Sequence, residues 1–433
     1  MTPSACPHAH VGISKLLSAL ADSYGDEVQD TKDLLASHRF DLAVVDVFSF
    51  SALDVFTAQH LPYMAFLHTL LGMFGIEETL SHPNYLLGKR IHQRTFLDRL
   101  ENSLMTPRMI LSTAEGTSKL NAQRIQHGLA TYGDPSTNIN GHPIIITTIF
   151  GFEYAKTLSP LSRLVGHFAD TSDSAKSPTT EDDAVVLRWL DSSSKGCVLV
   201  AFGTEAVPEK HHLREIIKGV LNSGHRLLLA IRELPLQEIG FREAREIIAD
   251  RNVSGDDFLS RAWIRQTMVL AHPSVVAFIC HGGLQSLVEG LYSGVPLIML
   301  PQWADREANT ARVLDRNLGL RLHMDNLTAH QVTDTISRLI SRRDDFRMNM
   351  QRFVQMNDRA GACTKGAANY IEEVLLFGYD HLIPVADSLG HFAAQSYDVM
   401  LFYILLLGFS SYLISLLAAR CCGFRLKKSI KTQ

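Results

Sequence analysis

The stretch that decides the fold is Trp263–Asn309, WIRQTMVLAHPSVVAFICHGGLQSLVEGLYSGVPLIMLPQWADREAN. Within it, Ser274–Cys280 is short, apolar and rich in Val, Ile and Phe, which predicts a buried strand. The glycines of 281–283 then allow a sharp turn and a close approach of the backbone to a ligand. Ser286–Tyr292 has helical composition, and Leu297–Leu300 predicts another buried strand. This order of strand, glycine turn, helix and strand predicts a βαβ unit.

The glycine turn lies at the carboxyl end of a predicted strand, which is where doubly wound sheets bind ligands. The free N–H groups at the start of the following helix suit a phosphate. His281 would add a hydrogen-bond donor, and Glu289 could accept hydrogen bonds from ribose hydroxyls. An ordinary βαβ unit with a tight turn is the alternative, because paired glycines are common at such turns.

The full pattern is more specific than the glycines alone. It resembles the donor-sugar signature of family 1 of the UDP-glycosyltransferase superfamily, the UDP-glucuronosyl and UDP-glucosyl transferases. The matching residues are Trp263, Gln266, Leu270, His272, Pro273, Phe278, His281, Gly283, Ser286, Glu289, Gly294, Pro296, Pro301, Asp305 and Asn309. The resemblance implies an α/β fold of the GT-B type, in which two Rossmann-like domains face a cleft. The N-terminal domain is expected to be incomplete, and one transmembrane helix is expected at the C-terminus.

The resemblance also assigns roles around a bound UDP-sugar. Trp263 would stack on the uracil, a flat apolar ring suited to an indole, while Gln266 would lie near the base and ribose. A second glycine turn, Gly203-Thr204 after the predicted strand Cys197–Phe202, would touch a phosphate, with a simple strand–helix turn as the alternative. The expected binding residues are Gly203, Thr204, Trp263, Gln266, His281, Gly282, Gly283, Gln285, Ser286, Glu289, Asp305 and Arg306.

Three residues of the stretch depart from the family pattern. Arg265 replaces a proline, Gln285 replaces an asparagine, and Arg306 replaces the glutamine that follows the sugar-binding Asp305. A guanidinium beside the sugar would favour an anionic sugar such as glucuronate through a charge-assisted pair. The alternative is that Arg306 points to solvent, which leaves glucuronate and glucose both open.

The catalytic pair is less complete in the sequence. Asp46 follows the predicted strand Phe40–Val45, and the resemblance implies that it orients a catalytic histidine that takes the acceptor's proton. Asp46 could instead cap the helix that follows it. His10, in the run PHAHV, is the candidate base, with His8 behind it. No strand precedes them, so the alternative is that both lie in a ragged terminus and that the first strand and its histidine are missing.

Further elements follow from hydrophobic patterns along the chain. Helices are expected over 13–35, 47–59, 211–221, 310–322, 329–344, 346–355 and 366–377, and strands over 61–66, 109–112, 144–154 and 226–232. Leu161–Ala169 and the polar run 170–183 are expected to connect the two domains. The expected organisation is an acceptor-binding domain over 1–169, a linker over 170–184, a UDP-sugar domain over 185–378, a juxtamembrane segment over 379–398, a transmembrane helix over 399–419 and a cytosolic tail over 420–433.

Composition narrows the class of protein. The net charge of −4 among 433 residues suggests no nucleic-acid partner. The six cysteines show no metal-site spacing and no disulfide framework. The resemblance implies no metal, because helix-terminus dipoles, His281 and Thr204 would neutralise the departing diphosphate, and no cofactor beyond the UDP-sugar co-substrate is expected. The first residues predict no secretory signal peptide. The sequons Asn252-Val253-Ser254 and Asn326-Leu327-Thr328 would suit a lumenal domain, although such triplets also occur by chance.

Val399–Ala419 contains no charged residue and is long enough to span the ~30 Å hydrocarbon core of a bilayer. Basic residues follow it, at Arg420, Arg425, Lys427, Lys428 and Lys431. The positive-inside rule places this tail in the cytosol and the main body in the lumen. This arrangement resembles that of the animal-type glucuronosyltransferases, and the resemblance implies a single-pass protein of the endoplasmic reticulum.

The resulting hypothesis is an inverting transferase that moves a sugar from a UDP-sugar to a hydroxyl of a small lipophilic acceptor. A protein of another class is the alternative: a non-catalytic UDP-sugar-binding homologue that lacks the catalytic histidine, or a dimerisation partner of related transferases. A homo- or hetero-oligomer is therefore a further expected association.

Overall fold

The computed structural model describes residues 9–68, 95–133, 137–139, 141–169, 172–192, 194–203, 208–231, 256–302, 305–359, 363–384, 393 and 396–429. Its helices are α1 (Ala9–Ser37), α2 (Phe50–Ala58), α3 (Phe96–Gln126), α4 (Asp173–Lys176), α5 (Glu181–Asp191), α6 (Lys210–Asn222), α8 (Gln266–Leu270), α9 (Leu284–Ser293), α10 (Arg306–Asp315), α11 (Ala329–Ser341), α12 (Arg343–Arg359), α13 (Thr364–Phe377) and α15 (Tyr397–Ser429). Short 3₁₀ turns lie at η2 (Thr137–Ile139) and η3 (Asp380–Leu382).

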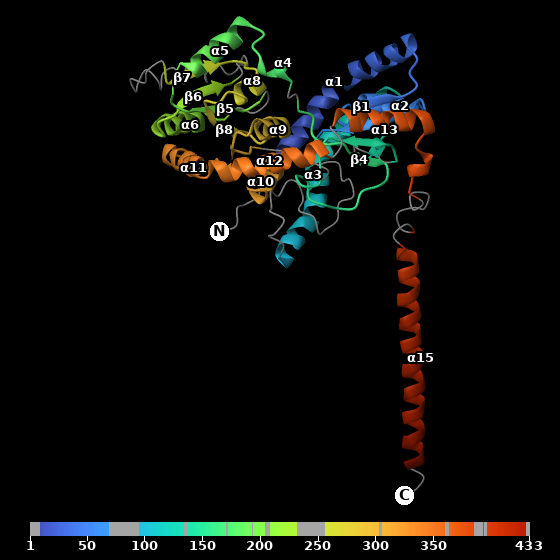
Figure 1. Ribbon diagram of the computed structural model, residues 1–433. Coiled ribbons are helices and arrows are strands. Elements are labelled where there is room, and N and C mark those ends of the chain that lie inside the picture. The colour runs from blue at the N-terminus through green and yellow to red at the C-terminus, as the bar shows by residue number, and fades with distance from the viewer. Residues whose placement is uncertain are drawn as a thin grey trace. The chain divides into compact units, whose positions relative to one another are not determined.

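The strands form two parallel sheets, as the α/β prediction requires (Figure 1). The first sheet has the order β1-β2-β3-β4, and the second has the order β10-β9-β8-β5-β6-β7. The strands are β1 (Ala43–Asp46), β2 (Tyr63–Leu67), β3 (Ile144–Ile146), β4 (Ser162–Leu164), β5 (Cys197–Ala201), β6 (Arg226–Ala230), β7 (Phe258–Arg261), β8 (Val275–Cys280), β9 (Leu297–Met299) and β10 (Gly319–Arg321).

The order of the second sheet creates a topological switch point. From β5 the chain continues outward to β6 and β7, and it then returns to the other side of β5 as β8. Adjacent strands therefore send their following loops to opposite faces, which opens a crevice at their carboxyl ends. β5 and β8 lie side by side, with Ala201 in register with Cys280. The two predicted glycine turns follow these two strands.

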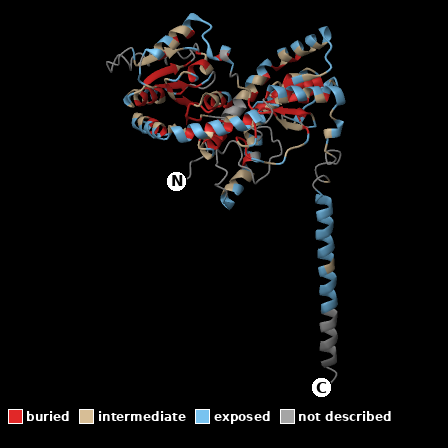
Figure 2. Ribbon diagram, viewed as in Figure 1, coloured by how far each residue is buried: buried red, intermediate tan, exposed pale blue. Residues whose placement is uncertain are grey.

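Apolar side chains cover both faces of the second sheet (Figure 2). Buried residues of α6 and α11 pack on one face, against β strand residues such as Val198 and Ile279. On the other face, residues of α5, α8 and α9 pack against Leu199 and Phe278. Strands buried on both faces appear in the sequence as continuous apolar runs, which is why the strands of this sheet can be predicted from the sequence.

The last helices of the main body contact the first sheet as well. Arg163 of β4 donates to Glu373 of α13 at 2.7 Å, and its guanidinium lies 4.2 Å from the centre of the Tyr370 ring. Asn357 of α12 accepts from the backbone N–H of His167 at 2.7 Å. The C-terminal helices thus connect the two halves of the fold.

Four expectations about local structure are wrong. The helix expected over 310–322 ends at Asp315, and Gly319–Arg321 is strand β10. Met109–Ser112 lies inside α3 and is not a strand, because the apolar run belongs to a longer helix that a Thr95–Asp98 capping box starts. The strand expected over Ile144–Tyr154 ends at Ile146. Part of Leu161–Ala169 is not a connection, since Ser162–Leu164 pairs with β3.

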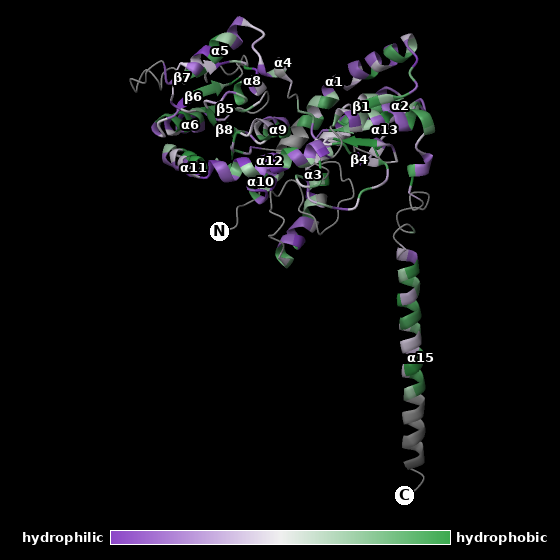
Figure 3. Cartoon of the chain, in the orientation of Figure 1, coloured by the Kyte–Doolittle hydropathy of each residue, from purple (hydrophilic) through white to green (hydrophobic). Residues whose placement is uncertain are grey.

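Residues 379–433, with 159–161, form a separate compact unit. Its main element is α15, of which Tyr397–Ala418 has a mean hydropathy of 2.1 and is fully exposed. Figure 3 shows the described apolar part of this helix in green. By length and composition this helix could cross a membrane.

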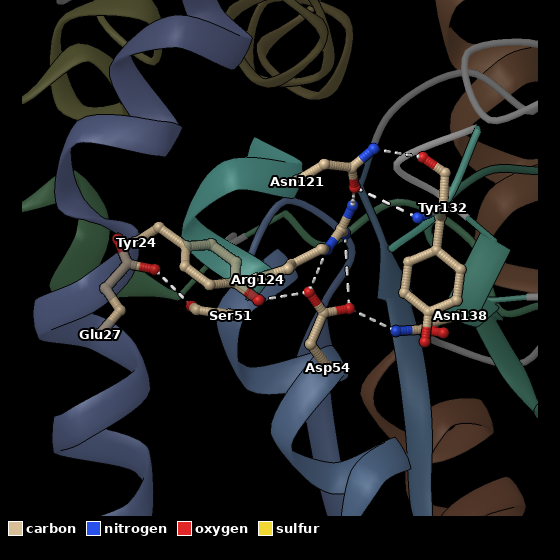
Figure 4. Close-up of polar contacts among 8 residues, drawn as sticks. All are labelled: Tyr24, Glu27, Ser51, Asp54, Asn121, Arg124, Tyr132 and Asn138. Atoms are coloured by element: carbon tan, nitrogen blue, oxygen red, sulfur yellow. Dashed lines mark hydrogen bonds and ion pairs between the residues drawn. The ribbon is translucent and has the colours of Figure 1, made fainter. Parts of the chain in front are cut away.

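A buried polar network joins the helices of the first half (Figure 4). The carboxylate of Asp54 on α2 accepts from Arg124 of α3 at 2.6 Å and from the hydroxyl of Tyr24 on α1 at 2.5 Å. It also accepts from the amide of Asn138, just before β3. Arg124 is completely buried and Asp54 nearly so. Burial raises the pKa of Asp54 in spite of the Arg124 guanidinium, so the charged form depends on all three partners.

Removing the Arg124 guanidinium should therefore destabilise the fold strongly. Arg124→Ala leaves a buried carboxylate without its cation, which costs about 3–5 kcal/mol of unfolding free energy. Chemical denaturation of the full chain in detergent measures this loss. The matched control is Arg188→Ala, because the Arg188–Glu181 pair spans 2.6 Å on an exposed surface and is worth about 0–1 kcal/mol. Equal denaturation midpoints for the two variants would contradict the role assigned to Arg124.

Candidate functional site

The site is centred on His281, which follows β8 at the switch point. A Cβ atom on Gly203 would lie 2.9 Å from Cε1 of His281, and one on Gly283 would lie 2.5 Å from its Nε2. The imidazole therefore fits between the two turns only because both residues are glycine. Gly203 and Gly282 also have φ angles of +69° and +91°, which residues other than glycine rarely adopt.

The environment of His281 keeps its imidazole neutral. The side chain is buried, and burial together with the nearby Arg306 guanidinium lowers its pKa to about 3. Within the described residues its Nδ1 is buried without a hydrogen-bond partner. A neutral imidazole has one N–H donor and one acceptor nitrogen, so it can donate to a phosphate oxygen without carrying charge.

A second cluster brings together four of the predicted donor-site residues. Gln266 donates through Nε2 to Glu289 at 2.6 Å and to the hydroxyl of Ser286 at 3.2 Å. Gln285 donates to the other carboxylate oxygen of Glu289 at 3.1 Å. Glu289 is thus held on α9 as an acceptor that ribose hydroxyls could share. Trp263, between β7 and α8, is 66% exposed, so its indole is accessible for stacking.

Asp305 and Arg306 lie where α10 begins. Asn309 donates through Nδ2 to the backbone carbonyl of Gly282 at 2.9 Å and to the Asp305 carboxylate at 3.1 Å, which ties α10 to the glycine turn. Arg306 is only 6% exposed. The alternative that it points to solvent is therefore wrong, and its guanidinium acts electrostatically on His281.

The carboxylate of Asp46 contacts a histidine, and that histidine is His68, not His10. Asp46 Oδ2 lies 2.9 Å from Nδ1 of His68, the residue that follows β2. Asp46 Oδ1 accepts from the backbone N–H of Phe48 at 2.8 Å. The helix-cap alternative does not describe this contact, because α2 begins later, at Phe50 with Ser49 as its N-cap.

Asp46 and His68 each shift the pKa of the other. Burial pushes the pKa of Asp46 upward, but the hydrogen bonds from His68 and the Phe48 amide outweigh it and lower that pKa. The Asp46 carboxylate raises the pKa of His68 above its ordinary value, burial opposes this, and Asp305 adds a further upward contribution. Asp305 therefore acts on the Asp46–His68 pair across the site.

His68 is the site residue that sequence reasoning missed. The sequence pattern predicted the histidine partner of Asp46 upstream of it, in the run PHAHV. A signal was nonetheless present, because Asp46 ends one predicted strand and His68 follows the next. Neighbouring parallel strands place such residues at the same edge of the sheet. His10 lies in the first turn of α1, but its side chain, His8 and Thr204 lie outside the described residues.

One further group could hold a metal ion. The ligand atoms of Glu209, His211 and His212 lie within 4.8 Å of one another at the start of α6. The positive end of a helix dipole disfavours a cation at that position, so the group has no assigned role.

Comparison with known proteins supports the donor-site interpretation. A family model described as UDP-glucoronosyl and UDP-glucosyl transferase matches residues 16–433. The chain belongs to this family. It is 26% identical to human UDP-glucuronosyltransferase 3A1, over 72% of this chain and 58% of that protein. It is also 26% identical to UDP-glycosyltransferase 43 of Pueraria montana var. lobata, over 78% of this chain and 74% of that protein.

Solved structures show the same fold. Medicago truncatula UGT71G1 complexed with UDP-glucose matches with a TM-score of 0.61 at 17% identity, over 84% of this chain and 82% of that one. Os79 from O. sativa in complex with U2F and trichothecene matches with a TM-score of 0.58 at 18% identity, over 85% and 84%. This family member therefore has the GT-B fold that the sequence predicts.

The buried neutral state of His281 predicts an acid-sensitive fold. The unfolded chain protonates this histidine near its ordinary pKa of 6.5, whereas the folded chain does so only near 3. Stability is thus full above pH 6.5 and falls as the pH drops below it. At about pH 5 the loss from this group is at most about 2 kcal/mol, at about 1.4 kcal/mol per pKa unit.

Denaturation of the wild type and of His281→Asn at about pH 7 and pH 5 measures this contribution. The variant should lose less stability between the two pH values than the wild type. The same loss in both proteins would show that His281 is protonated in the folded chain.

Proposed function

We propose that this family member is an inverting transferase that moves a sugar from a UDP-sugar to a hydroxyl of a small lipophilic acceptor. The observation that carries the proposal is the donor constellation around His281. A neutral imidazole and two glycine turns lie together at the start of α9. The exposed indole of Trp263 lies just before α8, whose Gln266 contacts Ser286 and Glu289 of α9. These groups provide a stacking surface for a base and hydrogen-bond donors for a diphosphate.

The leaving group of the transfer would be UDP, so the site must stabilise charge on the departing diphosphate. Backbone N–H groups at the start of α9, the His281 N–H and the Arg306 guanidinium are suited to this task. Thr204 would add a hydroxyl. With these groups in place no metal ion is needed in the proposed reaction.

Titration calorimetry with UDP, combined with product analysis on a panel of phenols and alcohols, tests the proposal. Binding of UDP with formation of an inverted glycoside is the expected result. Binding of UDP without any glycoside would instead favour the non-catalytic UDP-sugar-binding homologue or dimerisation partner.

The proposal extends to the identity of the transferred sugar, for which Arg306 is the relevant residue. Its buried guanidinium lies at the start of α10 next to Asp305, the expected partner of the sugar hydroxyls. A carboxylate on the sugar would form a charge-assisted pair with it. We therefore expect UDP-glucuronate to be preferred over UDP-glucose.

The variant Arg306→Gln tests this preference in a donor screen with UDP-glucuronate, UDP-glucose and UDP-N-acetylglucosamine. Loss of a charge-assisted hydrogen bond worth about 1.5–3 kcal/mol should lower kcat/KM for the glucuronate donor about 10- to 100-fold more than for the others. An equal loss for all three donors would mean that Arg306 serves the shared diphosphate and does not select the sugar.

The proposed location is the endoplasmic reticulum, with α15 as a single membrane span, the main body in the lumen and the basic tail in the cytosol. Support comes from the length and hydropathy of Tyr397–Ala418 and from the cations that follow it. In this proposal the lipid bilayer is a permanent binding partner of the chain.

Glycosylation of Asn326 tests this orientation. Asn326 is exposed just before α11, in the sequon that ends at Thr328. Expressed in mammalian cells, the chain should show an endoglycosidase-sensitive shift in mobility that decreases in Asn326→Gln. Asn252→Gln serves as the companion variant, because it removes the other sequon. A wild-type chain with no sensitive shift would argue against a lumenal main body.

A further inference from the structure

The carboxyl edge of the first sheet carries a histidine–carboxylate pair whose geometry suits proton abstraction. β1 and β2 are adjacent and parallel, with Asp46 in register with Phe66. His68 lies two residues beyond that point, so its ring reaches back to Asp46 at 2.9 Å. The atom that faces the carboxylate is Nδ1, and the hydrogen bond places the proton there. Nε2 is then the nitrogen with the lone pair.

The ring is held in this orientation from two sides. Phe48 lies 5.6 Å from it, centre to centre, and Phe66 lies 6.3 Å from it with the two planes 25° apart. The His68 side chain is nevertheless 49% exposed. It is therefore oriented by its neighbours and still accessible to a small substrate.

Helix α10, which follows Asp305, contacts the half of the chain that carries this pair. The segment after β3 binds α10 directly, since Arg312 donates to Glu153 at 3.0 Å and Tyr154 donates to Asp315 at 2.6 Å. These contacts hold α10, which begins after Asp305, against the carboxyl edge of the first sheet. The electrostatic effect of Asp305 on His68 follows from this arrangement.

We propose that His68 is the general base of the transfer, oriented by Asp46 at the carboxyl edge of the first sheet. The inference rests on the proposed glycosyl transfer and assigns its base to the end of β2. It replaces His10 as the expected base of this chain.

The proposed transfer is a single displacement, in which the bond that forms at the anomeric carbon is matched by one that breaks there. Nε2 of His68 takes the proton of the acceptor hydroxyl while the oxygen lone pair forms a bond to the anomeric carbon. The bond from that carbon to the diphosphate oxygen breaks, and its electron pair leaves with UDP. The Asp46 carboxylate stabilises the imidazolium that forms.

The test compares two acceptors that differ in their need for a base. At about pH 8, 4-nitrophenol is mostly ionised, whereas 4-methylphenol, with a pKa of about 10 like tyrosine, keeps its proton. In the full chain, His68→Ala should lower kcat/KM for 4-methylphenol about 100-fold or more. It should lower kcat/KM for 4-nitrophenol much less and leave UDP affinity unchanged. His330→Ala, at an exposed position on α11, is the matched control.

A pH profile adds a readout that a structural role would not change. Neutral His68 is the active form, and the carboxylates that face it are Asp46 and Asp305. The wild-type rate with 4-methylphenol should therefore rise with pH through a value above the ordinary 6.5 of histidine. In His68→Gln, whose amide can still donate to Asp46, this rise should be absent.

Several outcomes overturn the assignment. Equal losses with both phenols, or loss of UDP binding in His68→Ala, would make His68 a structural residue. Retained transfer in His68→Ala with loss in His10→Ala would return the role to His10 and leave the proposed function intact. A wild type that binds UDP and transfers no sugar to either phenol would refute the proposed function together with its base.

Discussion

The buried carboxylate of Asp54 is the constraint on which the first half of the molecule depends. A charge out of water is tolerated only when it is fully paired, and the partners of Asp54 come from α1, α3 and the segment before β3. α2 is therefore fixed against three other elements. Because α2 starts four residues after Asp46, its position also determines the turn in which Asp46 accepts from Phe48 and binds His68. The polar core thus positions the edge of the first sheet that carries the Asp46–His68 pair.

The second half depends on steric fit at one histidine. His281 fills the space that Cβ atoms on Gly203 and Gly283 would need, and Asn309 ties the adjacent Gly282 to the start of α10. Most of these residues lie within Trp263–Asn309, the stretch that carries the family pattern. The resemblance of this one stretch is why the sequence predicted the residues Gln266, Ser286 and Glu289 and the GT-B fold.

The remaining parts depend on long-range pairing, which a single sequence shows poorly. The Asp46–His68 contact requires that β1 and β2 be neighbours with Asp46 opposite Phe66, and neither strand displays its register. The burial of Arg306 likewise follows from how α10 packs on Gly282, which requires the segments after the neighbouring strands β8 and β9 to meet. Met109–Ser112 failed for a different reason: a short apolar run does not distinguish a strand from a helix segment, and the surrounding residues of α3 decide the matter.

His281 and His68 show how one fold can give the same side chain opposite protonation behaviour. His281 is buried beside a guanidinium, and both effects disfavour its charged form, so its pKa falls to about 3. His68 is half exposed, and the carboxylates of Asp46 and Asp305 raise its pKa. The first environment suits the neutral hydrogen-bonding group of the proposed donor site, and the second suits the proposed base. Environments that push the pKa values of paired groups apart are the pattern by which acid–base roles are divided in active sites. Here the division follows the two sheets, since each histidine ends a strand of its own domain.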